Sequence, residues 1–169
     1  RIPAEHFGFK ANHSVEDALY CLTEGVKYNR NLGKYVIMLS LDIKKAYPSM
    51  PRSRMIRELK GMRYADHLLH AIVATYVGNT SKVLTSDPRI QSSPYDVTSG
   101  LREGAVLSPR VYNSFTSGLF RKLKEAPYRD LGMHIGPEWH GAQSYADDIC
   151  VLTAHTSLAA AKRNMQTLM

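Results

Sequence analysis

The chain has 169 residues, of which 44% are hydrophobic, and its 22 lysines and arginines outnumber 15 aspartates and glutamates, giving a formal net charge of +7. This size suits one globular domain, or part of one, with a substantial core. No apolar run approaches the ~20 residues that span a bilayer, which argues against a membrane protein. The positive balance favours a polyanionic partner such as nucleic acid, although many proteins without such a partner share it.

The two cysteines, Cys21 and Cys150, lie far apart in apolar stretches. Such a pair suggests neither a disulfide framework nor a cysteine-based zinc site, and it fits a reducing compartment best. Residues 1–5 lack the apolar core of a secretion signal. Because the chain does not begin with methionine, we expect it to be a piece of a longer protein.

The first regular elements are a helix and a strand. Residues 14–31 carry apolar side chains at helical spacing, with Ser14 as the capping residue, Asp17 as its partner in a capping box and Gly33 at the end. The apolar run over residues 34–43 then predicts a strand.

The middle of the chain predicts one long helix over residues 52–77, which Gly78 stops. Its apolar residues form one stripe, at Met55, Leu59, Met62, Leu69, Ile72 and Tyr76. Two short strands are predicted at residues 81–85 and 95–98, followed by a helix at residues 107–124. Residues 127–141 are irregular, with a short strand near residues 134–135. A strand hairpin at residues 142–152 and a last helix at residues 156–169 complete the chain. This order indicates an α+β fold with an antiparallel sheet packed on helices.

Tyr145-Ala146-Asp147-Asp148 places two adjacent carboxylates in the bend between two apolar strands. Such acids repel each other across a shared cleft unless a cation offsets their charge. Asp42, near the end of the earlier apolar strand, adds a third carboxylate. The three acids predict a site for a pair of magnesium ions, whereas an Asp-Asp pair alone is more often a solvated turn.

Four segments, in this order, resemble successive motifs of reverse transcriptases. They are Phe7-Gly8-Phe9-Lys10 with its continuation to residue 19, Leu41-Asp42-Ile43-Lys44-Lys45-Ala46-Tyr47, Gly100-Leu101-Arg102-Glu103-Gly104-Ala105-Val106-Leu107-Ser108-Pro109, and Tyr145-Ala146-Asp147-Asp148. The first is similar to a segment typical of non-LTR retrotransposon and group II intron enzymes. The resemblance covers nearly the whole chain and favours the non-LTR, LINE-type polymerases.

The resemblance implies a polymerase palm with partial fingers, in which residues 1–35 are a fingers remnant with a helix and residues 36–169 are palm. It places the later palm motifs and the thumb outside residues 1–169. The implied function is RNA-directed DNA polymerase activity for retrotransposition, with an RNA template, a DNA primer and dNTP as partners and a nuclear location. We expect the isolated piece to be inactive, because the family's triphosphate and primer grips are absent from it.

Two alternatives to this function stay open. The chain could come from a catalytically degenerate or domesticated element that binds nucleic acid without catalysis, or from a reverse transcriptase of the intron-maturase type. The sequence leaves the oligomeric state undetermined.

By resemblance, Asp42 and Asp147 bridge two Mg²⁺ ions, Asp148 supports the pair, and the backbone carbonyl of Ile43 is an extra ligand. Magnesium prefers oxygen ligands and keeps several waters, so two or three carboxylates plus the incoming phosphates suffice. In two-metal nucleotidyl transfer, one ion activates the primer 3′-hydroxyl and the other holds the triphosphate and the leaving oxygen.

The resemblance also implies substrate contacts. Tyr47 takes the place of the aromatic residue that stacks beneath the incoming sugar and excludes a 2′-hydroxyl, although a core tyrosine is the alternative. Arg102, Glu103 and Gly104 lie in the loop that contacts the nucleotide. The family commonly has Gln at the position of Glu103, and a carboxylate there repels a triphosphate unless Arg102 or a metal compensates. Tyr145 would support the primer end, or is an ordinary hairpin residue.

A basic run covers residues 44–63, with seven lysines and arginines and a single acid, Glu58. A solvated helix face is the usual interpretation of such a run. We favour contact with the template or primer backbone, which would make binding depend on salt.

Overall fold

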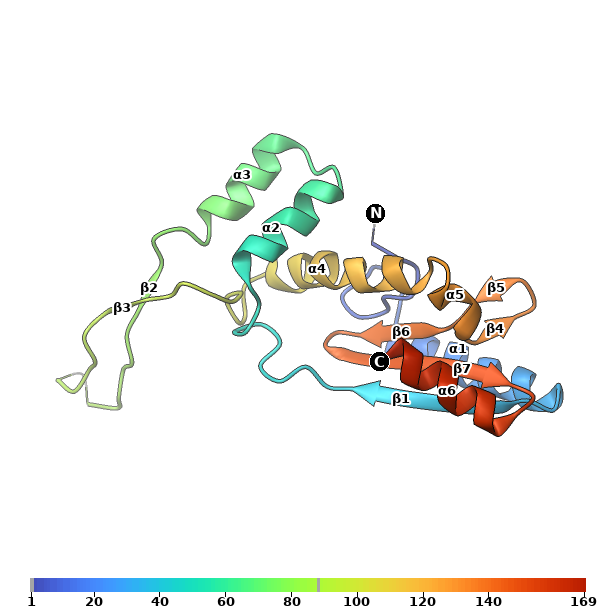
Figure 1. Ribbon diagram of the computed structural model, residues 1–169. Helices are drawn as coiled ribbons and strands as arrows, with labels where there is room; N and C mark the ends of the chain where they lie inside the picture. Colours follow the sequence, from blue (N-terminus) through green and yellow to red (C-terminus); the bar gives the residue numbers. More distant parts are fainter. Residues whose placement is uncertain (1, 88) are drawn as a thin grey trace. The chain divides into compact units, whose positions relative to one another are not determined.

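The computed structural model describes residues 2–87 and 89–169 (Figure 1). Its elements in chain order are α1 (Val15–Asn31), β1 (Tyr35–Leu41), α2 (Arg52–Gly61), α3 (Asp66–Ala74), β2 (Thr80–Ser81), β3 (Tyr95–Asp96), α4 (Ser108–Leu123), α5 (Tyr128–Leu131), β4 (His134–Ile135), β5 (Glu138–Trp139), β6 (Ala142–Tyr145), β7 (Asp148–His155) and α6 (Leu158–Leu168). Helices mix with antiparallel sheets, as predicted. No helix within the described ranges is long and apolar enough to cross a membrane.

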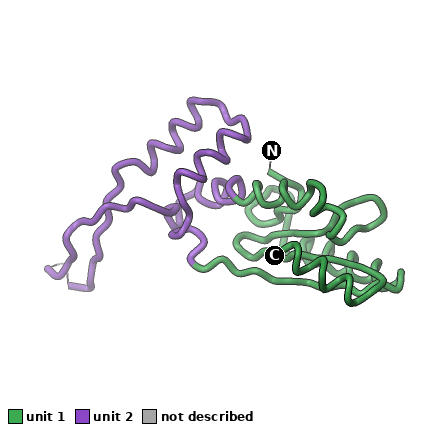
Figure 2. The backbone as a smooth tube through the Cα atoms, in the orientation of Figure 1, with its two compact units in different colours: residues 1–44, 116–169 green, residues 45–115 purple. Residues whose placement is uncertain are grey.

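The chain divides into two compact units (Figure 2). Unit 1 comprises residues 1–44 and 116–169, and unit 2 comprises residues 45–115, so that the boundary at residue 115 falls inside α4. The boundary expected after residue 35 lies within unit 1, directly after the first residue of β1. The assignment of these segments to fingers and palm stays a prediction.

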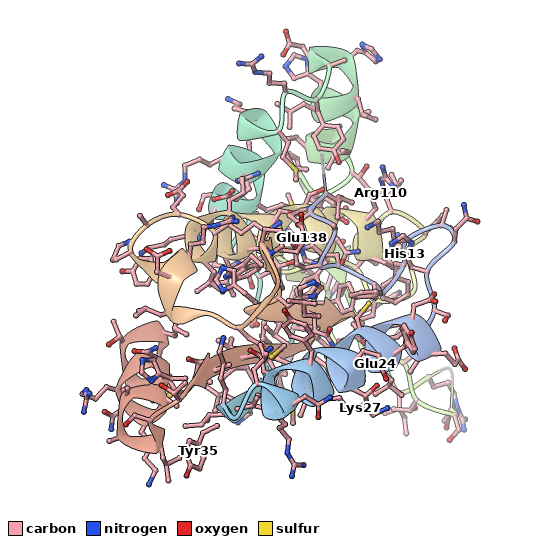
Figure 3. The ribbon with its side chains drawn as sticks, turned by 90° about the vertical axis from the view of Figure 1, so that its right-hand side faces the viewer. His13, Glu24, Lys27, Tyr35, Arg110 and Glu138 are labelled. Atoms are coloured by element: carbon pink, nitrogen blue, oxygen red, sulfur yellow. The ribbon has the colours of Figure 1, made fainter. Side chains whose placement is uncertain are left out.

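Helix α1 begins and ends where the sequence predicts. The Asp17 amide donates to Ser14 Oγ (3.2 Å), and the Ser14 amide donates to Asp17 Oδ2 (2.8 Å), which completes the capping box. Gly33 adopts φ 71° beyond the last turn. On the solvent side of α1, Lys27 and Glu24 form a salt bridge of 2.8 Å (Figure 3).

The sheet of unit 1 has the strand order β1-β7-β6, and both pairings are antiparallel. Strand β1 runs along β7 from Tyr35 opposite His155 to Leu41 opposite Ile149, so that only Asp148, the first residue of β7, lies beyond this ladder. Strand β7 also forms the predicted hairpin with β6, whose turn contains two residues. The central position of β7 explains its nearly continuous apolar sequence, because a strand covered on both faces does not alternate.

Helices cover both faces of this sheet, with α6 in front of it and α1 behind it in Figure 1. Phe120 and Leu123 of α4 and Met165 of α6 form a buried core with the β7 side chains Ile149 and Val151. On the α1 side, the side-chain amide of Gln143 donates to the backbone carbonyl of Ala18 (3.1 Å), and the side-chain amide of Asn29 donates to the backbone carbonyl of His134 (2.8 Å). These contacts hold α1 on β6 and β4.

Residues 5–8 run beside β6 as a short parallel extension of the sheet. The Ser144 amide donates to the Glu5 carbonyl and the Phe7 amide to the Ser144 carbonyl, both at 2.9 Å. His6 is 1% exposed, and its Nδ1 lies 2.8 Å from Ser144 Oγ. Burial, with a smaller effect of the Lys10 charge, lowers the pKa of His6 to about 4, so this imidazole is neutral at physiological pH.

In unit 2, the prediction of one long helix over residues 52–77 is wrong, because the structure has two helices there, α2 and α3. Helix α2 ends at Gly61, and Arg63 adopts φ 56°, a left-handed conformation that no helix continues through. The predicted apolar stripe is nevertheless buried, at Met55 and Leu59 of α2 and at Leu69 and Ile72 of α3. The apolar spacing therefore identified the packed side chains but not the break between the helices.

The predicted strands at residues 81–85 and 95–98 are largely irregular. The structure pairs only Thr80–Ser81 (β2) with Tyr95–Asp96 (β3), supported by an isolated bridge between Leu84 and Gln91. The Ser and Pro content of this segment accounts for its lack of a longer ladder.

Arg52 holds two loops of unit 2 together, the one between α3 and β2 and the one between β3 and α4. Its guanidinium donates to the backbone carbonyls of Gly100 (3.1 Å), Tyr76 (2.7 Å) and Val97 (2.6 Å), and it lies 5.4 Å from the centre of the Tyr76 ring. A charged donor that serves three carbonyls has no hydrophobic substitute, because its removal leaves several partly buried acceptors unpaired.

We predict that Arg52→Met lowers the free energy of unfolding by at least about 2 kcal/mol, since it removes three charge-assisted hydrogen bonds. Urea denaturation followed by circular dichroism measures this change. Arg57→Met is the matched control, because Arg57 is an exposed residue of the same helix. Equal stability of the two variants would contradict the role assigned to Arg52.

We further predict that His6 makes stability depend on pH. The pKa of His6 is about 4 in the folded chain against an ordinary value of 6.5. Its contribution is therefore complete above pH 6.5 and is lost as the pH falls towards 4, because only the unfolded chain takes up the proton. The loss is at most about 1.4 kcal/mol per pH unit. Urea midpoints between pH 4.5 and 7.5 should show a shallower slope for His6→Gln, and identical slopes would refute the prediction.

Candidate active site

The three predicted carboxylates belong to unit 1 and lie at one end of its sheet. Leu41 is the last residue of β1 and pairs with Ile149, so Asp42 follows beside Asp148 at the start of β7. Asp147 lies in the two-residue turn between β6 and β7. Antiparallel pairing thus brings together residues that lie more than a hundred positions apart in the sequence.

The carboxylates are accessible to a cation. Asp42 and Asp148 are exposed and Asp147 is half-buried. In the part of the chain that the structure describes, none of the three has a side-chain hydrogen bond or a salt bridge, and no three His, Cys, Asp or Glu side chains form a ready metal-binding cluster. The donor set nevertheless suits a hard divalent cation, because carboxylates without protein partners can rotate towards it.

The backbone on either side of this group is firmly held. The side chain of Ile43 packs against the core cluster and so anchors the chain next to Asp42. Tyr145 pairs with Asp148 across the hairpin, which puts both side chains on the same face. Tyr145 is therefore a neighbour of the acids, with 38% of its surface exposed.

Cys150 also lies close to the acids, opposite Ser40 of β1. Burial raises the pKa of its thiol, a hydrogen bond with Ser40 lowers it, and the nearby charge of Asp148 raises it further. The net effect is an increase, so the thiol stays protonated at neutral pH. A protonated thiol does not compete with carboxylates for a cation.

The turn that carries Asp147 is strained. Ala146 adopts φ 55°, in the left-handed region that costs an ordinary residue about 1 kcal/mol. Gly8 packs directly against it, since a Cβ placed on Gly8 would lie 2.3 Å from the Ala146 backbone nitrogen. No role for Gly8 was predicted from the sequence, although a glycine between two phenylalanines is a signal of close backbone approach.

A second group of predicted residues lies in unit 2, where Tyr47 meets the glycine-rich loop. The Leu101 amide donates to the Tyr47 carbonyl (2.8 Å) and the Gly100 amide to the Met50 carbonyl (2.9 Å). Tyr47 is half-buried, with its ring 5.2 Å from that of Tyr112. It is thus a partly packed tyrosine that keeps some exposed surface beside the loop.

The loop exposes the side chains that resemblance assigns to the nucleotide. Arg102 and Glu103 are both exposed, and Gly104 adopts φ 75°, which explains the need for glycine there. Ser108 Oγ donates to the Arg102 carbonyl (2.7 Å) and so fixes the loop to the start of α4. An open cavity of about 460 Å³, lined by Arg102, Glu103 and the neighbouring Arg52 and Tyr95, adjoins the loop.

The basic run consists of exposed side chains, apart from Arg52. The six exposed members are Lys44, Lys45, Arg54, Arg57, Lys60 and Arg63. Arg52 donates to backbone carbonyls, and the guanidinium of Arg54 lies 5.8 Å from the Phe115 ring. Arg52 is therefore removed from the candidate contacts with nucleic-acid phosphates, and the rest of the interpretation stays a prediction.

Comparison with known proteins agrees with the sequence motifs. The family model described as reverse transcriptase (RNA-dependent DNA polymerase) matches residues 1–169. The chain is 24% identical, over 98% of its length, to the RNA-directed DNA polymerase from mobile element jockey of Drosophila melanogaster. It is also 24% identical, over 75% of its length, to the retrovirus-related Pol polyprotein from type-1 retrotransposable element R2 of Popillia japonica.

The chain spans 17% of the length of each of these two relatives. Their names describe an RNA-directed DNA polymerase of a mobile element and a Pol polyprotein of a retrotransposable element. The match of the family model over the whole chain, together with three carboxylates at one end of an antiparallel sheet, shows that the chain belongs to the reverse transcriptase (RNA-dependent DNA polymerase) family.

Proposed function

We propose that the chain is the palm, with part of the fingers, of a non-LTR retrotransposon reverse transcriptase that adds dNTPs to a primer 3′-hydroxyl on an RNA template. The observation that carries this proposal is the pairing of β1 with β7, which puts Asp42 beside the Asp147-Asp148 hairpin. Family membership supplies the reaction class.

Asp42 and Asp147 would hold two Mg²⁺ ions, with Asp148 and the Ile43 carbonyl as supporting ligands. Bound there, the ions would supply charge stabilisation for the primer oxygen and for the departing pyrophosphate. The chain's own contribution is to fix three carboxylates at the neighbouring ends of two paired strands. The primer 3′-hydroxyl would give up its proton to solvent, its oxygen would attack the α-phosphate in line, and pyrophosphate would leave, with Tyr145 beside the primer end.

Tyr47 would select the sugar, and the loop of Arg102, Glu103 and Gly104 would contact the incoming nucleotide. The hydrogen bond from the Leu101 amide to the Tyr47 carbonyl supports this assignment, because it holds the backbone of Tyr47 next to the loop. The exposed Arg102 can offset the charge of Glu103 next to a triphosphate.

The names of the relatives support RNA template, DNA primer and dNTP as the partners of the longer protein, and retrotransposition implies a nuclear site of action. A degenerate element that only binds nucleic acid is the competing function. The three intact carboxylates favour catalysis over this alternative.

We predict that Asp147→Asn abolishes primer extension by a protein that carries this chain with its flanking sequence. Loss of a metal ligand should reduce the rate at least about 100-fold, because removal of a residue that only hydrogen-bonds to a ligand already lowers metal affinity or activity by up to about 100-fold. Asp130→Asn is the control, because Asp130 is an exposed residue of α5. Nucleic-acid binding without extension in either protein would favour the degenerate element.

We also predict that Tyr47→Ala relaxes the discrimination against ribonucleotides, because it removes the ring that would meet a 2′-hydroxyl. The ratio of kcat/KM for dNTP to that for rNTP should fall at least about tenfold, which corresponds to about 1.4 kcal/mol. Tyr47→Phe keeps the ring and should preserve the ratio. An unchanged ratio in an active Tyr47→Ala protein would remove Tyr47 from the sugar site.

A further inference from the structure

Residues 5–8, here called the N-terminal clamp, contact the acidic hairpin at several points. The clamp forms hydrogen bonds of 2.9 Å with both the backbone amide and the backbone carbonyl of Ser144, the residue before Tyr145. It therefore pairs along the edge of β6 that β7 leaves open. A strand paired on both edges has less freedom to shift its register than an edge strand.

The clamp is in turn fastened to α4 and to Lys124, the residue that follows this helix. Glu5 forms a salt bridge with Lys124, and its side chain is only 11% exposed. The His6 ring lies 4.5 Å from the Phe120 ring, in the core beneath the sheet. The ion pair and the ring contact thus add two side-chain anchors to the backbone hydrogen bonds of the clamp.

His6 links this anchorage to the hairpin through its side chain. Its Nδ1 lies 2.8 Å from Ser144 Oγ, and both residues are buried. Burial keeps the ring neutral at physiological pH, so the contact places no second charge beside the carboxylates. His6 thus fixes the strand that leads into the turn.

Gly8 makes the contact nearest to Asp147. An added Cβ would meet Ala146 N at 2.3 Å and the carbonyl carbon of Tyr145 at 3.2 Å, and both are backbone atoms that cannot rotate away. The adjoining Ala146 holds a strained φ of 55°. A strained backbone persists only where its surroundings enforce it, and Gly8 belongs to those surroundings.

We propose that His6 and Gly8 are positioning residues for the metal-binding acids: the N-terminal clamp holds the strained turn at Ala146 so that Asp147 and Asp148 face Asp42. This inference rests on the proposed function for its catalytic consequence. Its structural part, the dependence of the hairpin on the clamp, can be measured independently of catalysis.

The principal test is Gly8→Ala in a protein that carries the chain with its flanking sequence. The matched control is Gly61→Ala, because a Cβ at Gly61 meets nothing within 4 Å. Three quantities are compared with the wild type: hydrogen exchange of the peptide that contains residues 142–149, Mn²⁺ affinity by electron paramagnetic resonance, and kcat and KM in primer extension. Only the Mn²⁺ binding that Asp147→Asn abolishes is counted as binding to the candidate site.

Gly8→Ala should increase exchange in the hairpin peptide, weaken Mn²⁺ binding about tenfold or more, and lower kcat while KM for dNTP stays within about twofold. The loop that would bind dNTP lies in unit 2, which explains the expected split between kcat and KM. Gly61→Ala should change none of these quantities. Unchanged hairpin exchange and Mn²⁺ affinity in a folded Gly8→Ala protein would overturn the proposal.

Should Gly8→Ala fail to fold, His6 gives a second test. His6→Ala should loosen the hairpin in the same way, and His6→Asn, which keeps a polar atom near the position of Nδ1, should restore protection and Mn²⁺ binding in part. Equal behaviour of the two variants would refute the positioning role. A wild-type protein whose Mn²⁺ binding and extension do not depend on Asp147 would instead refute the proposed function, with the exchange data still deciding the clamp.

Discussion

The antiparallel pairing of β1 with β7 is the constraint on which the rest of unit 1 depends. Seven residue pairs, from Tyr35 with His155 to Leu41 with Ile149, fix the register of the two strands. A slip by one residue would turn every side chain of β1 to the opposite face and remove its apolar residues from the core. The packing of Ile37 and Leu39 against the core cluster therefore also fixes where Asp42 lies.

Burial in the core thus determines the geometry at the edge of the sheet. Phe120 and Met165 cover one face, and the Gln143 contact with Ala18 holds α1 on the other. The acids themselves contribute little to this arrangement, because they are largely exposed and have no side-chain partner among the described residues. Three like charges at one edge repel one another, so the hydrophobic core must offset that cost, which a bound cation would reduce.

Unit 2 depends on a different interaction, the three hydrogen bonds of the Arg52 guanidinium. This contact shows why net charge is a poor guide to partners. Arg52 belongs to the basic run that the sequence analysis associated with nucleic acid, yet its charge is directed at backbone carbonyls. The same contact steadies Gly100, whose close approach to Pro48 leaves no room for a Cβ, and with it the glycine-rich loop.

The sequence by itself determined the α+β class, the capped helix α1, the hairpin around Asp147 and Asp148, and the family, because capping, apolar periodicity and motif order are local properties. It misplaced the helix over residues 52–77, since apolar spacing continues through a break that the left-handed Arg63 introduces. Only the tertiary structure placed Asp42 beside Asp148, turned Arg52 inward and brought Gly8 against Ala146. Each of these contacts joins segments that are distant in sequence, and such contacts follow from strand pairing and packing rather than from any local pattern.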